Sequence, residues 1–263
     1  MIDAHIHLDW YQAKEQQEIL HSLEVDGMIA VSSNLDSCKK VWQLSKEQSV
    51  VYPTFGWHPE QPIPNLEEIE QIESLIHRHH EEIVGIGEVG LPYYTKAQNQ
   101  KLELQPYLEI VERFIKIAKQ YELPIVLHAV YDDADIVCDL LEKYQLDKAH
   151  FHWFKGSQAT IKRMIAQKYM ISITPDCLYE EEIQVLINAY PLELMMVETD
   201  GPWPFEGIYQ GKMTHPNMID DVIKQIARIK DLPMKQVKEK VFENTTQFYK
   251  ISIKDNTDKS SQV

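Results

Sequence analysis

Cysteine is scarce in this sequence, and long apolar runs are missing from it. The three cysteines, Cys38, Cys138 and Cys177, are scattered, so they form neither a disulfide framework nor the paired spacing of a zinc ribbon. No apolar stretch approaches the roughly 18–20 residues that cross a bilayer, and the first residues do not form a basic segment followed by an apolar signal. We therefore expect a cytoplasmic protein without a membrane segment.

Basic residues are also in deficit. The 263 residues include 26 Lys and Arg against 41 Asp and Glu, which gives a formal net charge of −15. Proteins that coat nucleic acid usually present a basic face, so this function class is disfavoured. An enzyme that brings a phosphate to a cation-filled pocket remains compatible, because bound metal ions would then be the largest local charges. Nothing in the sequence implies an obligatory protein partner.

Short apolar runs rich in β-branched residues alternate with longer amphipathic stretches. The runs that predict strands are 2–7, 27–32, 50–56, 83–88, 124–128, 148–152, 169–173 and 193–198. The stretches that predict helices are 12–25, 36–48, 65–80, 98–121, 132–144, 157–167, 179–189, 214–230 and 233–249. A strand followed by a helix, eight times over, indicates a parallel α/β sheet that closes into a (β/α)8 TIM barrel. Because no linker interrupts the pattern, we expect one domain over 1–251 and a polar C-terminal tail over 252–263.

The segment Asp3-Ala4-His5-Ile6-His7 ends the first predicted strand. Side chains alternate along a strand, so His5 and His7 emerge on one face, about 6–7 Å apart. Two neutral imidazoles placed in this way can bind one divalent cation from two directions. Two polar histidines at the end of an ordinary strand would give the same pattern.

Other residues that can bind metal stand where later strands end. They are Glu88 in the fourth strand, His128 in the fifth, His152 in the sixth and Asp200 after the eighth. Active sites of such barrels lie at the C-terminal mouth, so we expect these side chains to converge with His5 and His7. Taken singly, Asp200 would serve as a turn cap, Glu88 as a solvated acid, and His128 or His152 as a core histidine. His150 lies deeper in the expected barrel and is a structural or supporting candidate.

Several segments, in this order, resemble the signature blocks of the TatD family, which comprises metal-dependent deoxyribonuclease-type hydrolases within the amidohydrolase-like barrels. The segments are Asp3-Ala4-His5-Ile6-His7-Leu8-Asp9, Phe55-Gly56-Trp57-His58-Pro59, Gly87-Glu88-Val89-Gly90-Leu91, Leu127-His128-Ala129, His152-Trp153-Phe154-Lys155-Gly156 and Glu198-Thr199-Asp200-Gly201-Pro202. The resemblance spans nearly the whole chain, and the ordered set is far more specific than any one block.

The resemblance implies a site for two divalent metal ions. His5, His7, Glu88 and Asp200 would bind one ion, and Glu88, His128 and His152 the other, so that Glu88 bridges them. Two cations roughly 3.5–4 Å apart can neutralise a phosphodiester and activate water. Asp200 is the candidate general base, since a carboxylate beside the activated water can accept its proton. Imidazole with carboxylate suits Zn²⁺, Mn²⁺, Co²⁺, Ni²⁺ or Fe²⁺, and the family also uses Mg²⁺.

The substrate-binding part departs from the family pattern. Pro92 stands where the family usually has an aspartate, and Met213 and Thr214 replace an Arg-Asn pair. Without that guanidinium, a neighbouring basic residue would have to contact an anionic substrate. We expect substrate contacts from four side chains, His58, Trp153, Lys212 and His215. Stacking on a base or sugar is a further expectation for three aromatics, Trp57, Trp153 and Trp203.

These patterns predict a metal-dependent hydrolase that cleaves phosphodiester bonds of DNA, in the manner of a 3′–5′ exonuclease. An alternative on the same barrel is the hydrolysis of another ester, a lactone or an amide, because barrels of this kind host many substrates. A third is a metal-binding scaffold without catalysis, although such a protein would not need to keep Asp200. The substrate is accordingly expected to be DNA or a small phosphodiester or ester.

Overall fold

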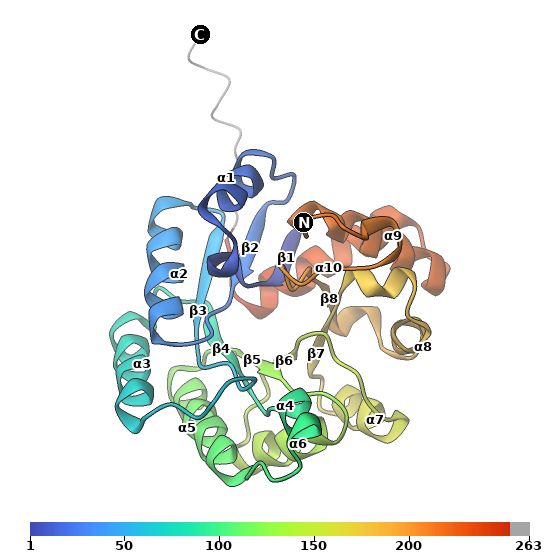
Figure 1. Ribbon diagram of the computed structural model, residues 1–263. Coiled ribbons are helices and arrows are strands. Elements are labelled where there is room, and N and C mark those ends of the chain that lie inside the picture. The colour runs from blue at the N-terminus through green and yellow to red at the C-terminus, as the bar shows by residue number, and fades with distance from the viewer. Residues whose placement is uncertain (253–263) are drawn as a thin grey trace.

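A sheet of eight parallel strands forms the centre of the computed structural model, which describes residues 1–252 (Figure 1). The strands are β1 (Ile2–Ile6), β2 (Gly27–Ala30), β3 (Val51–Phe55), β4 (Gly85–Gly90), β5 (Ile125–His128), β6 (Ala149–Phe151), β7 (Met170–Ile173) and β8 (Met195–Val197). Their order in the sheet is their order along the chain. The predicted strands are therefore confirmed in place and in sequence.

The two edges of the sheet, β1 and β8, are joined at their C-terminal ends. The backbone N–H of Asp200 donates to the carbonyl of His5 (3.0 Å), and the N–H of His7 donates to the carbonyl of Gly201 (2.8 Å). The sheet closes on itself through these bonds, which confirms the (β/α)8 TIM barrel. The same bonds hold the segment that follows β8 directly against the His5–His7 segment.

Helices surround the barrel (Figure 1). They are α1 (Ala13–His21), α2 (Leu35–Glu47), α3 (Leu66–His79), α4 (Tyr93–Gln98), α5 (Gln105–Tyr121), α6 (Asp132–Tyr144), α7 (Gln158–Ala166), α8 (Glu181–Ala189), α9 (Ile219–Lys230) and α10 (Met234–Phe248). Asn34, Asn65 and Ser157 start α2, α3 and α7, since each side chain accepts a first-turn N–H. Among residues 1–252, no helix combines the length and apolar composition needed to span a bilayer.

Alternate strand residues pack on opposite sides of the sheet. Met28 and Ile125 belong to the large cluster between the strands and the helices. Ile29, Val126 and Met170 belong to a smaller cluster that also contains Tyr249, as expected for side chains directed into the barrel. The barrel is thus filled with apolar side chains below its mouth, and the polar site described next lies above this packed layer.

Two predicted helices differ from the structure. The predicted helix 98–121 is wrong at its start: α4 ends at Gln98, and α5 begins only at Gln105, with Pro106 in its first turn. Proline lacks an N–H and is favoured at a helix start rather than inside a helix. The predicted helix 214–230 begins at Ile219, after a short 3-10 turn that starts at Pro216. Of the predicted tail, 253–263 lies outside the described residues.

Candidate metal centre

Six side chains predicted as metal ligands meet at the C-terminal mouth of the barrel. His5 lies in β1 and His7 directly after it, Glu88 lies in β4, and His128 ends β5. His152 follows β6, and Asp200 follows β8. None of them is more than 9% exposed. The convergence follows from the fold, because the C-terminal ends of all strands of a closed parallel sheet face one opening.

Glu88 lies at the centre of this cluster, and its two carboxylate oxygens face different histidines. Oε2 lies 3.2 Å from His5 Nε2 and 3.1 Å from His7 Nε2. Oε1 lies 2.7 Å from His152 Nε2 and 3.0 Å from His128 Nδ1. The carboxylate thus joins two pairs of imidazoles, one on each side. This is the arrangement required of a carboxylate that bridges two cations.

Asp200 completes the side of the cluster formed by His5 and His7. Its Oδ1 lies 3.3 Å from His5 Nε2 and 3.5 Å from His7 Nε2. Ligand atoms of these three residues all lie within 4.8 Å of one another, as do those of His5, Glu88 and His152. Both groups are compact enough to hold a cation.

Several buried polar atoms in this cluster have no hydrogen-bond partner among the described residues. They include His5 Nε2, Glu88 Oε2 and Asp200 Oδ1, which face one another. A buried charged or polar atom without a partner is strongly unfavourable. A divalent cation would satisfy all three atoms at once, and imidazole nitrogen with carboxylate oxygen is a donor set that transition-metal ions accept. The residues therefore fit a metal ion.

The cluster holds its carboxylates ionised. Burial opposes the charge on Glu88, but the surrounding His152, His58 and His5 rings outweigh it and place the pKa of Glu88 well below its usual value. The pKa of Asp200 is likewise lowered, since the adjacent His5 ring, together with His152 and His7, outweighs its burial. Burial disfavours the charged form of His5 as well, yet Glu88 and Asp200 raise its pKa to about 9. The carboxylates and the protonated histidine rings thus attract one another across the cluster. A bound cation would take the place of the protons on these rings.

Among the predicted substrate-contacting residues, His58 and Trp153 lie at the site. Both line a cavity of about 910 Å³ above this cluster, and His58 Nε2 lies 3.4 Å from Glu88 Oε1. Trp153 Nε1 donates to Asp176 Oδ2 (2.6 Å). Trp57, by contrast, is only 2% exposed and packs near Tyr107, so the expectation that it stacks on a base is wrong.

Lys212 and His215 do not join the site. Neither lines the mouth cavity, and the His215 ring is bonded to Ser22 Oγ (2.9 Å) and to the N–H of Asn217 (3.1 Å). His215 caps the short 3-10 turn that starts at Pro216, so its ring is used structurally. The expected anion contact from these two residues is therefore not supported by their placement.

Two carboxylates that support the cluster were missed in the sequence. Glu60 Oε1 lies 3.3 Å from His128 Nε2, and the same carboxylate accepts from the first N–H groups of α4. Glu198 Oε1 accepts from the N–H of Trp153 (2.7 Å) and lies 3.7 Å from His152 Nδ1. A carboxylate behind a ligating histidine orients the ring. The signal for Glu198 was its position two residues before Asp200, at the end of the last strand.

Comparisons with known proteins agree with this arrangement. The family model described as TatD related DNase matches residues 2–250. A Haemophilus influenzae protein described as an uncharacterized metal-dependent hydrolase is 38% identical over 95% of this chain and its own full length. Human deoxyribonuclease TATDN3 is 23% identical, over 95% of this chain and 94% of its own. The crystal structure of YjjV, a TatD homologue from Escherichia coli, has a TM-score of 0.83 at 22% identity and covers 96% of this chain and 98% of that one.

The chain is therefore a metal-dependent hydrolase on a TIM barrel, as indicated by its fold, by its clustered imidazoles and carboxylates, and by these similarities. More specifically, it belongs to the TatD-related DNase family, because the family model covers nearly all of it.

Proposed function

We propose that this hydrolase cleaves phosphodiester bonds of DNA from the 3′ end, through a centre of two divalent metal ions. The observation that carries the proposal is the placement of Glu88, whose two oxygens face separate pairs of histidines. The name of the human relative, a deoxyribonuclease, supports DNA as the substrate. The three buried, unpaired cysteines support action in a reducing cytoplasm.

The ligands of the two ions would divide at Glu88. Oε2 of Glu88 would join His5, His7 and Asp200 at one ion, while Oε1 would join His128 and His152 at the other. When bound, such ions neutralise phosphodiester charge and lower the pKa of water. Mg²⁺, Mn²⁺, Zn²⁺, Co²⁺ and Ni²⁺ are the candidates, among which the imidazoles favour the transition metals.

Asp200 would act as the general base. Its carboxylate is ionised because its pKa is lowered, and the backbone bond from its N–H to His5 fixes its position beside the ligands. An ionised carboxylate at this point can accept the proton of the attacking water and pass it toward solvent at the cavity. His58, whose pKa burial lowers, is a neutral ring at the other side of Glu88, where it can donate to or accept from the substrate.

The proposal is tested with Asp200→Asn, which keeps the size of the side chain and removes its charge. We expect it to lose most phosphodiester hydrolysis, measured with single-stranded oligonucleotides and a chromogenic diester in the presence of Mn²⁺, Co²⁺ or Mg²⁺. Asp139→Asn, at a side chain 72% exposed on α6, is the matched control and should retain full activity. Equal rates for wild type and Asp200→Asn would refute the assignment of the base.

Hydrolysis of another ester, a lactone or an amide is the second candidate. It is favoured by the charge of the mouth, where Lys155 is the one Lys or Arg among the described residues that line the cavity. Turnover of a lactone or carboxylic ester panel, without shortening of any polynucleotide, would select this candidate over the first.

A further inference from the structure

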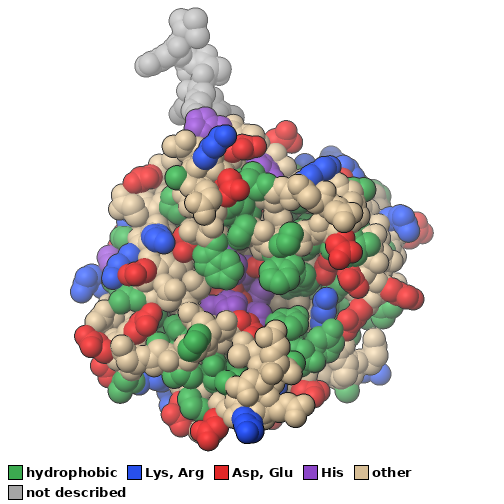
Figure 2. All heavy atoms as spheres, viewed as in Figure 1, with side chains coloured by type: hydrophobic (Ala, Val, Ile, Leu, Met, Phe, Trp, Pro, Cys, Tyr) green, Lys and Arg blue, Asp and Glu red, His purple; other side chains and the backbone are tan. Residues whose placement is uncertain are grey.

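The mouth of the barrel is bordered by exposed aromatic side chains. Among residues 1–252, the four most exposed Trp, Tyr or Phe side chains are Trp10 (46%), Tyr94 (47%), Tyr179 (37%) and Trp203 (55%). All four line the cavity above the metal centre. Figure 2 shows this end of the molecule, with histidines at the base of the central hollow and hydrophobic side chains around it. Exposed apolar groups gathered at one opening indicate a binding surface.

These rings stand on both sides of the bridging carboxylate. The Trp10 ring stacks on His7 (centroids 3.9 Å apart, planes at 12°). Trp203 follows Asp200 closely, and its backbone N–H donates to the Asp200 carbonyl (3.1 Å). Tyr94 lies across the centre, with its ring 6.1 Å from that of His128. If the scissile bond of a substrate lay above Glu88, a planar group on either side of that bond would therefore contact an aromatic ring.

The charges of the same cavity oppose a long polyanion. Its lining outside the six predicted ligands includes four carboxylates, Glu60, Asp176, Glu180 and Glu206. Lys155 is the single Lys or Arg that lines it within the described chain, and its Nζ lies 3.8 Å from Asp176 Oδ2. Cations at the centre would neutralise the one phosphate placed there, whereas further phosphates along a strand would face acids.

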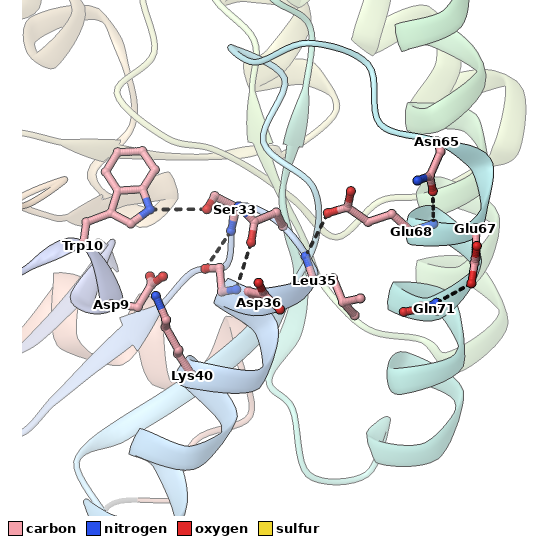
Figure 3. A pocket seen from close by; sticks show the side chains of 12 residues that line it. Asp9, Trp10, Ser33, Leu35, Asp36, Lys40, Asn65, Glu67, Glu68 and Gln71 are labelled. Atoms are coloured by element: carbon pink, nitrogen blue, oxygen red, sulfur yellow. Dashed lines mark hydrogen bonds between the residues drawn. The ribbon is translucent and has the colours of Figure 1, made fainter.

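The adjoining surface repeats this charge pattern. A second cavity, of about 680 Å³, shares Trp10, Ser33 and Asn34 with the mouth and continues between the first turns of α2 and α3 (Figure 3). Four carboxylates line it, those of Asp9, Asp36, Glu67 and Glu68, against one amine, that of Lys40. A strand that left the metal centre over Trp10 would thus find no row of cations for its backbone.

We propose that the substrate is a short nucleotide phosphodiester, or the last two nucleotides of a frayed strand. Its bases would stack on the four exposed aromatic rings at the mouth, which together form its rim. Phosphates beyond the scissile one would not contribute to binding. This inference rests on the proposed function and specifies its substrate class. Stacking of one base on an aromatic side chain is worth roughly 5- to 150-fold in affinity, and it tolerates any base. The rim would therefore replace the basic groove by which most nucleases hold a strand.

Two pairs of substrates test the inference. Thymidine 3′- and 5′-p-nitrophenyl phosphates are compared with methyl p-nitrophenyl phosphate, which has the same leaving group without a base. We expect kcat/KM for the better nucleoside ester to exceed that of the methyl ester by about tenfold or more. A ratio near one, with both esters hydrolysed, would overturn the inference and leave the proposed function standing. No hydrolysis of any diester or oligonucleotide would overturn both.

The second pair is a dithymidine monophosphate and an oligothymidylate of about 20 nucleotides, each measured between about 50 and 200 mM salt. Binding through one phosphate predicts that affinity falls only about threefold over this range, whereas binding through six phosphates predicts a fall of roughly 300-fold. We expect the two substrates to have similar kcat/KM per end and the shallow dependence. Strong preference for the long strand with a steep dependence would overturn the inference.

Trp203 is the residue with which the rim is tested directly. Trp203→Leu should lower the ratio of kcat/KM between the nucleoside and methyl esters by about tenfold, and Trp203→Phe, which keeps a ring, should restore most of it. Ile208→Ala, at an equally exposed apolar side chain (61%) that does not line the cavity, is the matched control and should leave the ratio unchanged. An unchanged ratio in Trp203→Leu would refute the role of this ring.

Discussion

Two histidines, one within the short strand β6 and one directly after it, have opposite surroundings. His150 and the nearby His152 are both buried, at 0% and 4% exposure. Ser172 and Tyr249 satisfy both ring nitrogens of His150, at 2.6 Å and 2.7 Å. His152 has its Nε2 2.7 Å from Glu88 and no hydrogen-bond partner for its Nδ1 among the described residues. Both ring nitrogens of His150 are thus hydrogen-bonded within the protein, whereas those of His152 are not both satisfied.

The two pKa values shift in opposite directions although both rings are buried, because their neighbours differ. Burial disfavours the charged form of both rings, and the nearby His5 and His152 add to this effect at His150, so the pKa of His150 lies well below its usual value. At His152 the carboxylates of Glu88 and Glu198 outweigh burial, and its pKa lies well above it. The neutral ring is structural, whereas the ring among carboxylates can exchange its proton for a cation.

The network around His150 also defines its tautomer. The Ser172 hydroxyl donates to Glu198, so it must accept from Nε2–H of His150, and the Tyr249 hydroxyl then donates to Nδ1. Every buried polar atom in this network has a partner. What distinguishes His152, the proposed metal ligand, from His150 is thus not burial but the presence of unsatisfied neighbours.

The strongest test of this division is Glu88→Gln, which removes the charge shared by both halves of the centre. We expect activity to fall by more than the roughly 10–100-fold that loss of an outer partner of a metal ligand produces. Bound metal, measured by elemental analysis, should fall as well. Glu109→Gln, at an exposed glutamate on α5, is the control. Full metal content and activity in Glu88→Gln would show that Glu88 is not the bridge.

Removal of metal with a chelator should next lower the melting temperature. A ligand that binds only the folded state at 100 times its Kd contributes about 2.7 kcal/mol, or about 5–11 °C for a chain of this size. The shift, followed by circular dichroism, should reverse on adding Mn²⁺ or Zn²⁺ and should shrink in Glu88→Gln. A melting temperature that is the same with and without metal would contradict the interpretation of the unpartnered atoms.

Glu198→Gln is expected to have an intermediate effect, because Glu198 contacts both networks. It accepts from Ser172 on the side of His150 and faces His152 Nδ1 at 3.7 Å on the other. Loss of its charge should reduce metal affinity and activity by about 10–100-fold without unfolding the chain. Titration with metal, followed by calorimetry, separates this positioning role from a structural one. Glu193→Gln, nearby and exposed, should match wild type.

Strand ends were the part of this site that the sequence could predict. Parallel strands of a barrel end at one opening, so identifying the strands was enough to bring His5 and Asp200 together across almost 200 positions. Apolar, β-branched runs make such strands visible without knowledge of their partners. The convergence of the six residues is therefore a consequence of topology, and their binding of metal stays a prediction.

The roles of loops and supporting side chains could not be predicted from the sequence, because they depend on where the chain turns and which way each side chain points. Trp57 and Trp203 both follow strands, yet one is buried against Tyr107 and the other is 55% exposed. Glu60 contacts α4, a short helix that the periodicity did not predict. His215 was expected at the mouth, but its ring caps a turn near Ser22 instead.

Tyr249→Phe is expected to have the smallest effect on activity, and it decides whether the two histidine networks are independent. The change deletes the donor to His150 Nδ1 and leaves a buried nitrogen unsatisfied, which costs about 1–3 kcal/mol of unfolding free energy, measured by urea denaturation. Hydrogen bonds nevertheless run from Tyr249 through His150 and Ser172 to Glu198, so a path toward His152 exists. If unsatisfied neighbours alone confer function, kcat/KM should stay within about twofold of wild type, because His152 and Glu88 keep their positions. A fall of tenfold or more in the folded variant would mean that the structural ring orients the ligand through Glu198, and the two networks would then have to be treated as one.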